Sequence, residues 1–228
     1  MRIIIADKIK KTYPDASLGI LVMRGISNPN QHEELGRHKL LLENSLREKF
    51  SGLSKGELKN TKPIMTYRKY YKRFRKTYHV QLQLESIVFK KKSIPNVSSL
   101  VEVMFMAELK NLLLTAGHDL DVLELPIKLD AAEGTEKFKL LSSQEKELLP
   151  DDMFIADSIG IMSSIIYGPD LRTRITTNTK NVLFTVYAPA GIEKSKVFQH
   201  LQDIRDYARM IAPDSIVELL KVFDWKNI

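Results

Sequence analysis

The sequence predicts an α+β fold, with helices in its first half and short strands in its second half. Two patterns indicate this. Apolar residues recur at helical spacing through most of residues 31–111, whereas short apolar runs separated by turn-forming residues follow between 112 and 188. An amphipathic segment at about 193–211 predicts one more helix, stopped by Pro213 and followed by a short tail that includes Trp225.

Composition is that of a soluble globular domain. The chain has 228 residues, of which 43% are hydrophobic and 28% charged, enough to bury about 70% of the unfolded surface. It contains no cysteine, which excludes disulfides, thiolate metal sites and cysteine nucleophiles. No apolar run approaches the ~18 residues of a membrane span, and the start MRIIIADKIKK lacks a signal-peptide core. We therefore expect a cytoplasmic protein with no membrane partner.

A strand and a long helix are expected first. The apolar run LGILVMRGI predicts a strand at 18–26, closed by the turn-forming residues 27–30. Leucines at helical spacing among charged residues predict an amphipathic helix at 31–50, which ends near Gly52. After a looser stretch, Pro63 is suited to the first turn of a basic helix.

Two more helices should precede the strands. We expect a short helix at about 81–90, before Pro95 breaks the chain. Ser99 and Glu102 have the spacing of a capping box, which predicts a helix from there to about Asn111. Because this helix is apolar nearly all round, we expect it to be central. Six strands are expected after it, at 112–116, 125–130, 137–141, 153–157, 160–167 and 182–188.

Charge is polarised along the chain, whose net charge is +7. Residues 61–98 contain ten Lys and Arg against one acidic residue, whereas residues 118–158 contain eleven acidic residues against four lysines. The basic excess is larger than solubility requires, so it favours a surface for nucleic-acid phosphates. The candidate RNA-binding residues are Arg68, Lys69, Lys72, Arg73, Arg75, Lys76, Lys90, Lys91 and Lys92.

Aromatic residues are interleaved with these basic residues. If exposed, their rings would offer flat faces on which bases stack. Their spacing, together with that of Ile64, is largely helical, which predicts that most of the rings point inward. Two interpretations therefore stay open for the basic face: a nucleic-acid surface and an ordinary solvated helix face. The aromatic residues are Tyr67, Tyr70, Tyr71, Phe74 and Tyr78.

Known catalytic motifs are absent. The sequence has no Gly-rich dinucleotide loop, no P-loop lysine, no zinc-protease helix and no serine-hydrolase elbow. The five histidines lack metal-ligand spacing, so neither a metal nor a cofactor is predicted. His118 stands out because it follows an apolar run and lies beside Gly117, Asp119 and Asp121. The residues alone leave open whether its imidazole is functional or structural.

Two later stretches contain side chains suited to ligand contacts. In DMFIADSIGIMSSIIYGPD (152–170), small residues lie among strand-like apolar runs, which leaves room for a ligand or for close packing. In RTRITTNTKNVLFTVYAPAG (172–191), hydroxyl groups, Arg172 and Arg174 suit phosphate or carboxylate contacts, and equally an exposed loop.

Several motifs resemble one protein family. IPNVSSLVEVMF, TAGHDLD, DDMFIAD, YGPDLRT and TKNVLFTVYAP are similar in order and spacing to the B3/B4 domain of the phenylalanyl-tRNA synthetase β subunit, and especially to free-standing proteins built from it. The resemblance covers about residues 60–212. It implies a single tRNA-binding domain over 1–228, with 1–60 as an N-terminal α/β extension and 61–212 as the core. The implied architecture has three layers, a large β-core, a buried central helix and flanking helices.

The resemblance also implies a pocket, which in the synthetase hydrolyses tyrosine misattached to phenylalanine tRNA. His118 matches the histidine of that pocket, and Asp170 stands where the family has a glutamate, so these are the candidate catalytic residues. We expect His118 at the pocket mouth, because a strand ending at Thr115 and a flexible Gly117 would turn the imidazole off the sheet edge. Asp170 and residues 158–164 should form the opposite wall. The candidate pocket residues are Met104, Phe105, Gly117, Ser163, Ser164 and Gly168.

Met104 and Phe105 replace the family's polar Thr-Asn pair, which speaks against tyrosine editing and predicts a cavity narrowed for a small side chain. The predicted function is a tRNA-binding protein, with hydrolysis of mischarged aminoacyl-tRNA in trans left open. The alternative is a small-molecule or amino-acid binding protein that reuses the pocket without RNA. No adenylate-forming motif is present, so synthetase activity is not expected, and neither is a DNA partner.

Overall fold

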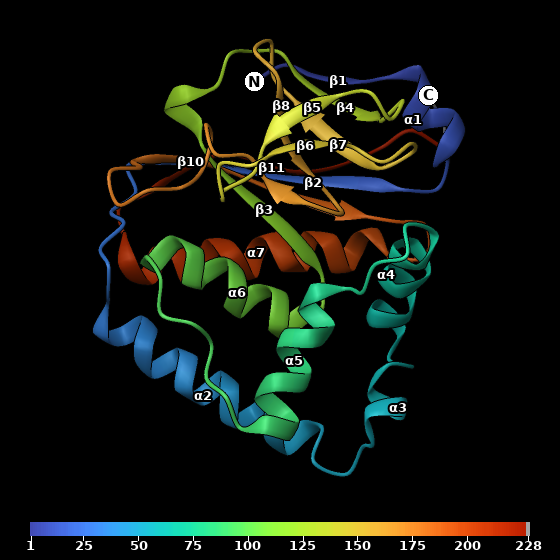
Figure 1. The fold of residues 1–228 in the computed structure, drawn as a ribbon. Coiled ribbons are helices and arrows are strands. Elements are labelled where there is room, and N and C mark those ends of the chain that lie inside the picture. Colours follow the sequence, from blue (N-terminus) through green and yellow to red (C-terminus); the bar gives the residue numbers. More distant parts are fainter. Residues whose placement is uncertain (227–228) are drawn as a thin grey trace.

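A computed structural model describes residues 1–226 and arranges them in three layers (Figure 1). Helices form one layer, a four-stranded sheet the middle layer and a five-stranded sheet the outer layer. The predicted α+β class is confirmed. No helix among the described residues combines the length and the apolar character that crossing a membrane requires.

The middle sheet contains β2 (Ser17–Arg24), β3 (Leu114–Asp119), β10 (Asn181–Ala188) and β11 (Ile216–Asp224). Its order is β11–β2–β10–β3, and all neighbours are antiparallel. The N-terminal segment thus supplies an interior strand, β2. The tail expected after Pro213 is instead β11, which pairs with β2 along its length. β3 is an edge strand, and its free edge faces the helices and the loops that follow β8.

The outer sheet has the order β1–β4–β7–β8–β9. Its strands are β1 (Ile3–Ile5), β4 (Ile127–Ala131), β7 (Met153–Ala156), β8 (Ile161–Ser164) and β9 (Gly168–Pro169). A separate hairpin joins β5 (Lys137–Lys139) to β6 (Glu145–Glu147). The strand expected at 160–167 is shorter, because it ends at Ser164, where the chain turns before β9.

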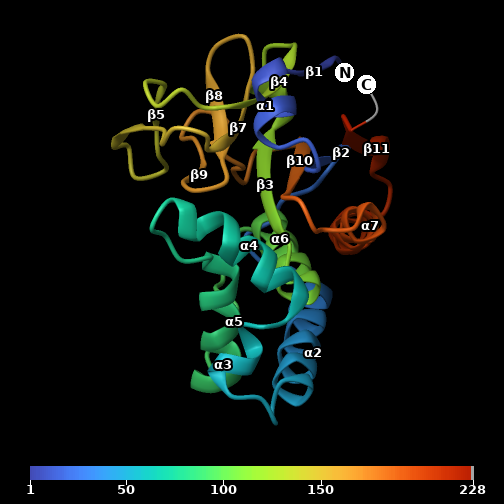
Figure 2. The same ribbon diagram turned by 90° about the vertical axis from the view of Figure 1, so that its right-hand side faces the viewer.

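The helix layer surrounds one buried helix, as predicted. Nine of the 13 residues of α6 (Ser99–Asn111) are buried, because α2, α5 and α7 pack around it and β3 lies above it. Figure 2 shows α2 and α5 extending away from the sheets on this side. The other helices of this layer are α2 (Glu33–Lys49), α3 (Lys55–Leu58), α4 (Lys62–Arg73), α5 (His79–Lys90) and α7 (Lys194–Ile211). Two short helices lie beside the sheets instead: α1 (Asp7–Thr12) packs on β4, and η1 (Leu120–Val122) packs on β10.

The capping box predicted at the start of α6 is wrong. Ser99 is already helical, and its buried hydroxyl has no hydrogen-bond partner among residues 1–226. Glu102 pairs with Lys39 at 2.6 Å instead. The helix start is held by Asn28, whose side-chain oxygen accepts the N–H of Leu100 at 2.9 Å. A residue far away in the sequence therefore satisfies this helix terminus.

The aromatic face of α4 points inward, as its spacing predicted. Tyr67 and Tyr71 are fully buried with Tyr78, and the rings of Tyr67 and Tyr78 stack with centroids 4.5 Å apart. Tyr70 is buried too, and Phe74 is half-buried. These rings are therefore not free to stack on bases, and the basic residues of α4 form its exposed face.

Candidate functional site

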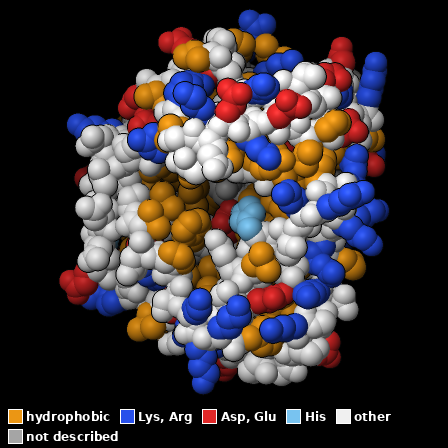
Figure 3. All heavy atoms as spheres, viewed as in Figure 1, with side chains coloured by type: hydrophobic (Ala, Val, Ile, Leu, Met, Phe, Trp, Pro, Cys, Tyr) orange, Lys and Arg blue, Asp and Glu red, His pale blue; other side chains and the backbone are white. Residues whose placement is uncertain are grey.

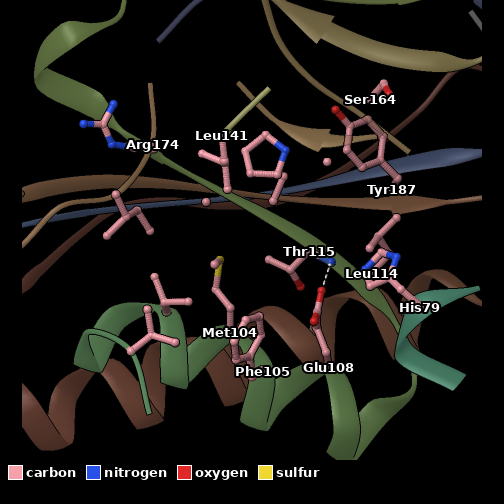
Figure 4. Close-up of a pocket in the computed structure, with 17 residues that line it drawn as sticks. His79, Met104, Phe105, Glu108, Leu114, Thr115, Leu141, Ser164, Arg174 and Tyr187 are labelled. Atoms are coloured by element: carbon pink, nitrogen blue, oxygen red, sulfur yellow. Dashed lines mark hydrogen bonds between the residues drawn. The ribbon is translucent and has the colours of Figure 1, made fainter. Parts of the chain in front are cut away.

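A cavity of about 350 Å³ lies along the free edge of β3. Side chains of α6 rise toward it from below, and Leu141, Arg174 and Tyr187 surround it from above (Figure 4). The walls are mostly apolar. The lining residues are His79, Val97, Val101, Met104, Phe105, Glu108, Leu114, Thr115, Ala116, Gly117, Leu141, Ser164, Gly168, Pro169, Arg174, Ile175 and Tyr187.

Five of the six predicted pocket residues line this cavity: Met104, Phe105, Gly117, Ser164 and Gly168. The cavity is nevertheless large enough for more than a small side chain. Although Met104 and Phe105 do lie in the wall, the volume is more than twice the ~150 Å³ of a cavity that binds benzene. A ring-sized group therefore fits, and a small side chain is not required.

His118 does not lie at the pocket mouth, so its predicted placement is wrong. β3 continues to Asp119, and His118 is 0% exposed between the two sheets. Its Nδ1 is 2.8 Å from the hydroxyl of Thr173, and its Nε2 is 3.2 Å from that of Ser163. Burial lowers its pKa to about 3, so the imidazole is neutral near pH 7.

Gly117 is a close-packing residue within β3 and does not end the strand. A Cβ there would lie 2.5 Å from Sδ of Met104 and 2.6 Å from Cδ1 of Ile175. The glycine therefore permits close packing of α6 on β3 instead of forming a turn. Because strand side chains alternate between faces, Thr115 faces the helices, while His118 faces the outer sheet.

Asp170 is also buried and does not line the cavity. Its Oδ1 accepts the N–H of Thr173 at 2.9 Å and also the Thr173 hydroxyl, while Oδ2 accepts the N–H of Arg172 at 3.2 Å. The carboxylate therefore holds the turn after β9 and does not face the cavity, contrary to its predicted position.

A hydrogen-bonded chain nevertheless connects the two predicted catalytic residues. The Thr173 hydroxyl donates to Asp170, so it accepts from Nδ1–H of His118. Nε2 of His118 then accepts from Ser163, whose oxygen is 2.7 Å from the Tyr187 hydroxyl. Ser163, the sixth predicted pocket residue, therefore lies behind the cavity wall. The chain runs within the protein, and only Tyr187 reaches the cavity.

Glu108 is a cavity residue that the sequence did not single out. It lies on α6, is buried, and accepts the N–H of Thr115 with Oε1 at 2.8 Å. No cation pairs with it among residues 1–226, and burial raises its pKa to about 8. The carboxyl group is therefore mostly protonated near pH 7. The signal in the sequence was one acid in the later turns of a helix that is otherwise apolar.

His79, at the start of α5, is a second polar residue of the cavity that the sequence did not single out. The Tyr71 hydroxyl donates to the carbonyl oxygen of Ile165 at 2.7 Å and lies 3.1 Å from Nδ1 of His79. Because that hydroxyl hydrogen is already used, Nδ1 carries the proton and donates to Tyr71. Nε2 is left as an acceptor, and burial lowers the pKa of the imidazole to about 4.

A basic groove adjoins the cavity. It has a volume of about 640 Å³ and lies between α4 and the start of α5. Figure 3 shows hydrophobic side chains around a hollow in this face and Lys and Arg side chains gathered beside it. Residues 76–78 line the groove, and His79 lines the cavity, so the two hollows share one segment of chain. The basic groove is lined by Lys59, Arg68, Lys69, Lys72, Arg75 and Lys76.

The other predicted RNA-binding residues lie elsewhere. Arg73 turns away from the groove, donates to the Tyr13 hydroxyl at 2.9 Å and lies 3.8 Å from a carboxylate oxygen of Asp151. Lys90, Lys91 and Lys92 are exposed at the opposite end of α5, about 16 Å along the helix at 1.5 Å per residue. The basic segment thus presents separate groups of cations.

Within residues 1–226, no group of three or more His, Asp or Glu side chains is arranged to hold a metal ion. The lining hydroxyls of Thr115, Ser164 and Tyr187 are hydrogen-bonded within the protein. The side-chain groups left to a ligand are the carboxyl of Glu108, the imidazole of His79 and the rim guanidinium of Arg174.

The fold and site define a three-layered α+β domain with an apolar cavity beside a basic groove. The chain belongs to the B3/4 domain family, whose model matches residues 66–218. The predicted family is therefore confirmed.

A solved structure is also similar: an N-terminal fragment of the phenylalanyl-tRNA synthetase β subunit from Pyrococcus horikoshii, at 17% sequence identity and a TM-score of 0.48. The match covers 96% of this chain and 54% of that one, so the chain spans about half the fragment's length. No curated protein matches the chain in sequence.

Proposed function

We propose that this chain is a tRNA-binding domain whose cavity accommodates the group esterified to the 3′ end of the tRNA. One observation carries the proposal: the basic groove and the apolar cavity adjoin across residues 76–79. A ligand with a phosphate backbone and a terminal uncharged group would occupy both at once. The resemblance to the B3/B4 domain of a tRNA synthetase supports the same class of ligand.

The groove supplies the charge that such a ligand needs. Five of its six cations were predicted as RNA-binding residues, and none of the five has a carboxylate partner among residues 1–226: Arg68, Lys69, Lys72, Arg75 and Lys76. Cations that are not neutralised within the protein release counterions when they contact phosphates, which makes binding strongly dependent on salt. These five residues are therefore the proposed phosphate contacts.

The electrostatics of the cavity favour binding over hydrolysis. A general base must be deprotonated before it can accept a proton, and a base with a low pKa accepts one only weakly. Glu108 is mostly protonated near pH 7, and His79, with a pKa of about 4, is a weak base. Hydrolysis by His118 and Asp170 would require the wall to open, because both are buried behind it.

A filter-binding titration of tRNA against salt tests the proposal. The log of the affinity should fall with the log of the salt concentration, with a slope of about −0.9 for each phosphate contacted, or about −0.7 in single-stranded parts. A salt-independent affinity, or no binding, would refute it. A screen of mischarged tRNAs, with wild type beside His118→Ala, separates binding alone from ester hydrolysis.

A second candidate is a small-molecule binding protein that does not use RNA. The apolar lining of the cavity favours it, because most small-molecule sites are mostly apolar cavities with a few polar groups. Ligand binding in the cavity together with no tRNA binding would select this candidate.

A further inference from the structure

Two polar atoms converge on the apolar cavity without partners of their own. Glu108 uses Oε1 to accept the N–H of Thr115, and among residues 1–226 its Oε2 has no hydrogen-bond partner. His79 uses Nδ1 toward Tyr71, and Nε2 has no partner in the same part of the chain. Figure 4 shows both side chains at one end of the cavity, beneath Tyr187 and near Leu114.

Both atoms are accessible from the cavity and have no partner among residues 1–226, so only a molecule in the cavity can form hydrogen bonds with them. A ligand that displaces water there keeps its affinity only if it replaces both hydrogen bonds, which points to a ligand that satisfies both atoms. Oε1 accepts from a backbone N–H, so the carboxyl proton is carried by Oε2. The contact with Tyr71 fixes the tautomer of His79 that carries its proton on Nδ1, and Nε2 is therefore an acceptor without a partner among residues 1–226. One end of the cavity therefore offers one hydrogen-bond donor and one acceptor, and neither carries a charge.

We infer that the cavity is a binding site for an uncharged ligand with an apolar body of about ring size that carries both a hydrogen-bond acceptor and a hydrogen-bond donor. Glu108 donates to the acceptor of the ligand, and His79 accepts from its donor. A carboxamide on an apolar body has this chemistry. An ammonium or carboxylate group would lose its hydration without meeting an opposite charge among the residues at this end. Arg174, the charged lining residue, is exposed at the rim, where its guanidinium donates to the carbonyl oxygen of Leu171.

This inference concerns the cavity alone and does not require RNA. Its failure would leave tRNA binding at the groove intact, and the absence of tRNA binding would leave the cavity's ligand class intact. The two proposals are therefore tested by separate measurements.

Four probes that share one ring separate the alternatives: toluene, benzamide, benzylamine and benzoate. Their dissociation constants are measured by NMR titration of the whole chain near pH 7. We expect benzamide to bind about tenfold more tightly than toluene, because it gains two neutral hydrogen bonds. Benzylamine and benzoate should bind more weakly than toluene. Equal or tighter binding of either charged probe than of benzamide, or binding of no probe, would overturn the inference.

Variants assign the preference to its residues. Glu108→Leu should bind toluene but lose the preference for benzamide, while Glu108→Gln, which keeps a donor and an acceptor, should retain it. His79→Phe should lose part of it, and the exposed Glu48→Gln should behave as wild type. The assignment of this preference to Glu108 is contradicted if a folded Glu108→Leu variant still prefers benzamide. If Glu108→Leu does not fold, the assignment is tested by Glu108→Gln, and loss of the preference in that variant contradicts it.

Discussion

Glu108 places a carboxyl group without an ion-pair partner among residues 1–226 in the wall of a mostly apolar cavity. Its one hydrogen bond, from Thr115, does not replace the hydration that the ionised form would have in water. The titratable groups around it are also neutral near pH 7: burial raises the pKa of Tyr67, Tyr71 and Tyr78 and lowers the pKa of His79. The protonated form of Glu108 is thus the stable one.

Glu108→Gln should therefore remove a pH dependence from the free energy of unfolding. The folded-state pKa, about 8, lies above the ordinary 4.5, so the stabilisation by Glu108 is complete below 4.5 and is lost as pH rises toward 8. Relative to wild type, the variant should gain stability between pH 5 and pH 7, by roughly 3 kcal/mol at most. Urea unfolding across this range measures it. A constant difference between the two proteins would contradict the buried, protonated state.

His118 should show the opposite pH dependence. His118→Leu leaves the hydroxyls of Ser163 and Thr173 without their partner, which should cost about 1–3 kcal/mol near pH 7. The pKa of His118 is lowered from 6.5 to about 3, so its stabilisation is present above pH 6.5 and is lost as pH falls. The destabilisation by the substitution should therefore shrink toward pH 4 in urea unfolding experiments. His38→Leu, at a half-buried position of α2, is the control.

Single residues of the sequence predicted the site only in part. Small residues such as Gly117 and Ser164 were identified as pocket residues with the help of the family resemblance, and both line the cavity. The position of His118 was not predicted correctly. The sequence alone does not show whether Gly117 ends the strand or, as in the structure, allows Met104 to pack closely on it. Glu108 was missed because one acid in an apolar helix does not reveal whether it faces solvent or a cavity.

The packing of α6 on β3 sets the width of the cavity at the scale of elements. Gly117→Ala would place a methyl group 2.5 Å from Sδ of Met104, so α6 must shift or Met104 must move into the cavity. We expect a loss of about 1–3 kcal/mol in the free energy of unfolding and weaker toluene binding. Gly160→Ala, where a Cβ meets nothing within 4 Å, is the control. Equal stability and toluene affinity in the two variants would show that this contact does not limit the cavity.

One face of α4 packs in the core, and the other face carries basic residues of the groove. Its buried tyrosines pack in the core, while Arg68, Lys72 and Arg75 are exposed in the groove. Reversing these three to Glu should weaken tRNA binding at least tenfold and make its salt slope shallower. The melting temperature should change little, because the substituted side chains are exposed.

A control variant with the same change of charge keeps that prediction specific. Lys11, Lys196 and Arg209 are exposed, lie outside the groove and have no ion-pair partner among residues 1–226. Reversing them to Glu changes the net charge equally but leaves the groove intact. If both triple variants lose tRNA binding equally, the effect is one of net charge, and the basic groove is not the binding surface.

Elements with a strong period were predicted well, and those set by long-range pairing were not. The aromatic spacing of α4 correctly indicated which face is buried. β1 and β11 were missed because each is stabilised by a partner far away in the sequence: β1 pairs with β4, and β11 pairs with β2. Hydrophobic periodicity is local, so it carries little information on such pairings.

At the scale of the whole molecule, many acidic and basic residues lie on different sides. The acidic residues of 118–158 follow the outer sheet and its loops, whereas the basic residues lie on the helical side, around α4 and the start of α5. A polyanion is therefore attracted toward the groove and repelled from the outer sheet. This orientation would place one end of a bound tRNA beside the cavity.

The most direct test of this account compares two forms of one tRNA. In one form an apolar N-acetyl-aminoacyl group, which carries no charge, is joined to the 3′ end by a stable amide, and in the other the 3′ hydroxyl is free. We predict that the aminoacylated form binds about tenfold more tightly, because the apolar group enters the cavity. Reversal of Arg68, Lys72 and Arg75 should weaken both forms and preserve their ratio. Equal affinity of the two forms for wild type would contradict a shared ligand for groove and cavity.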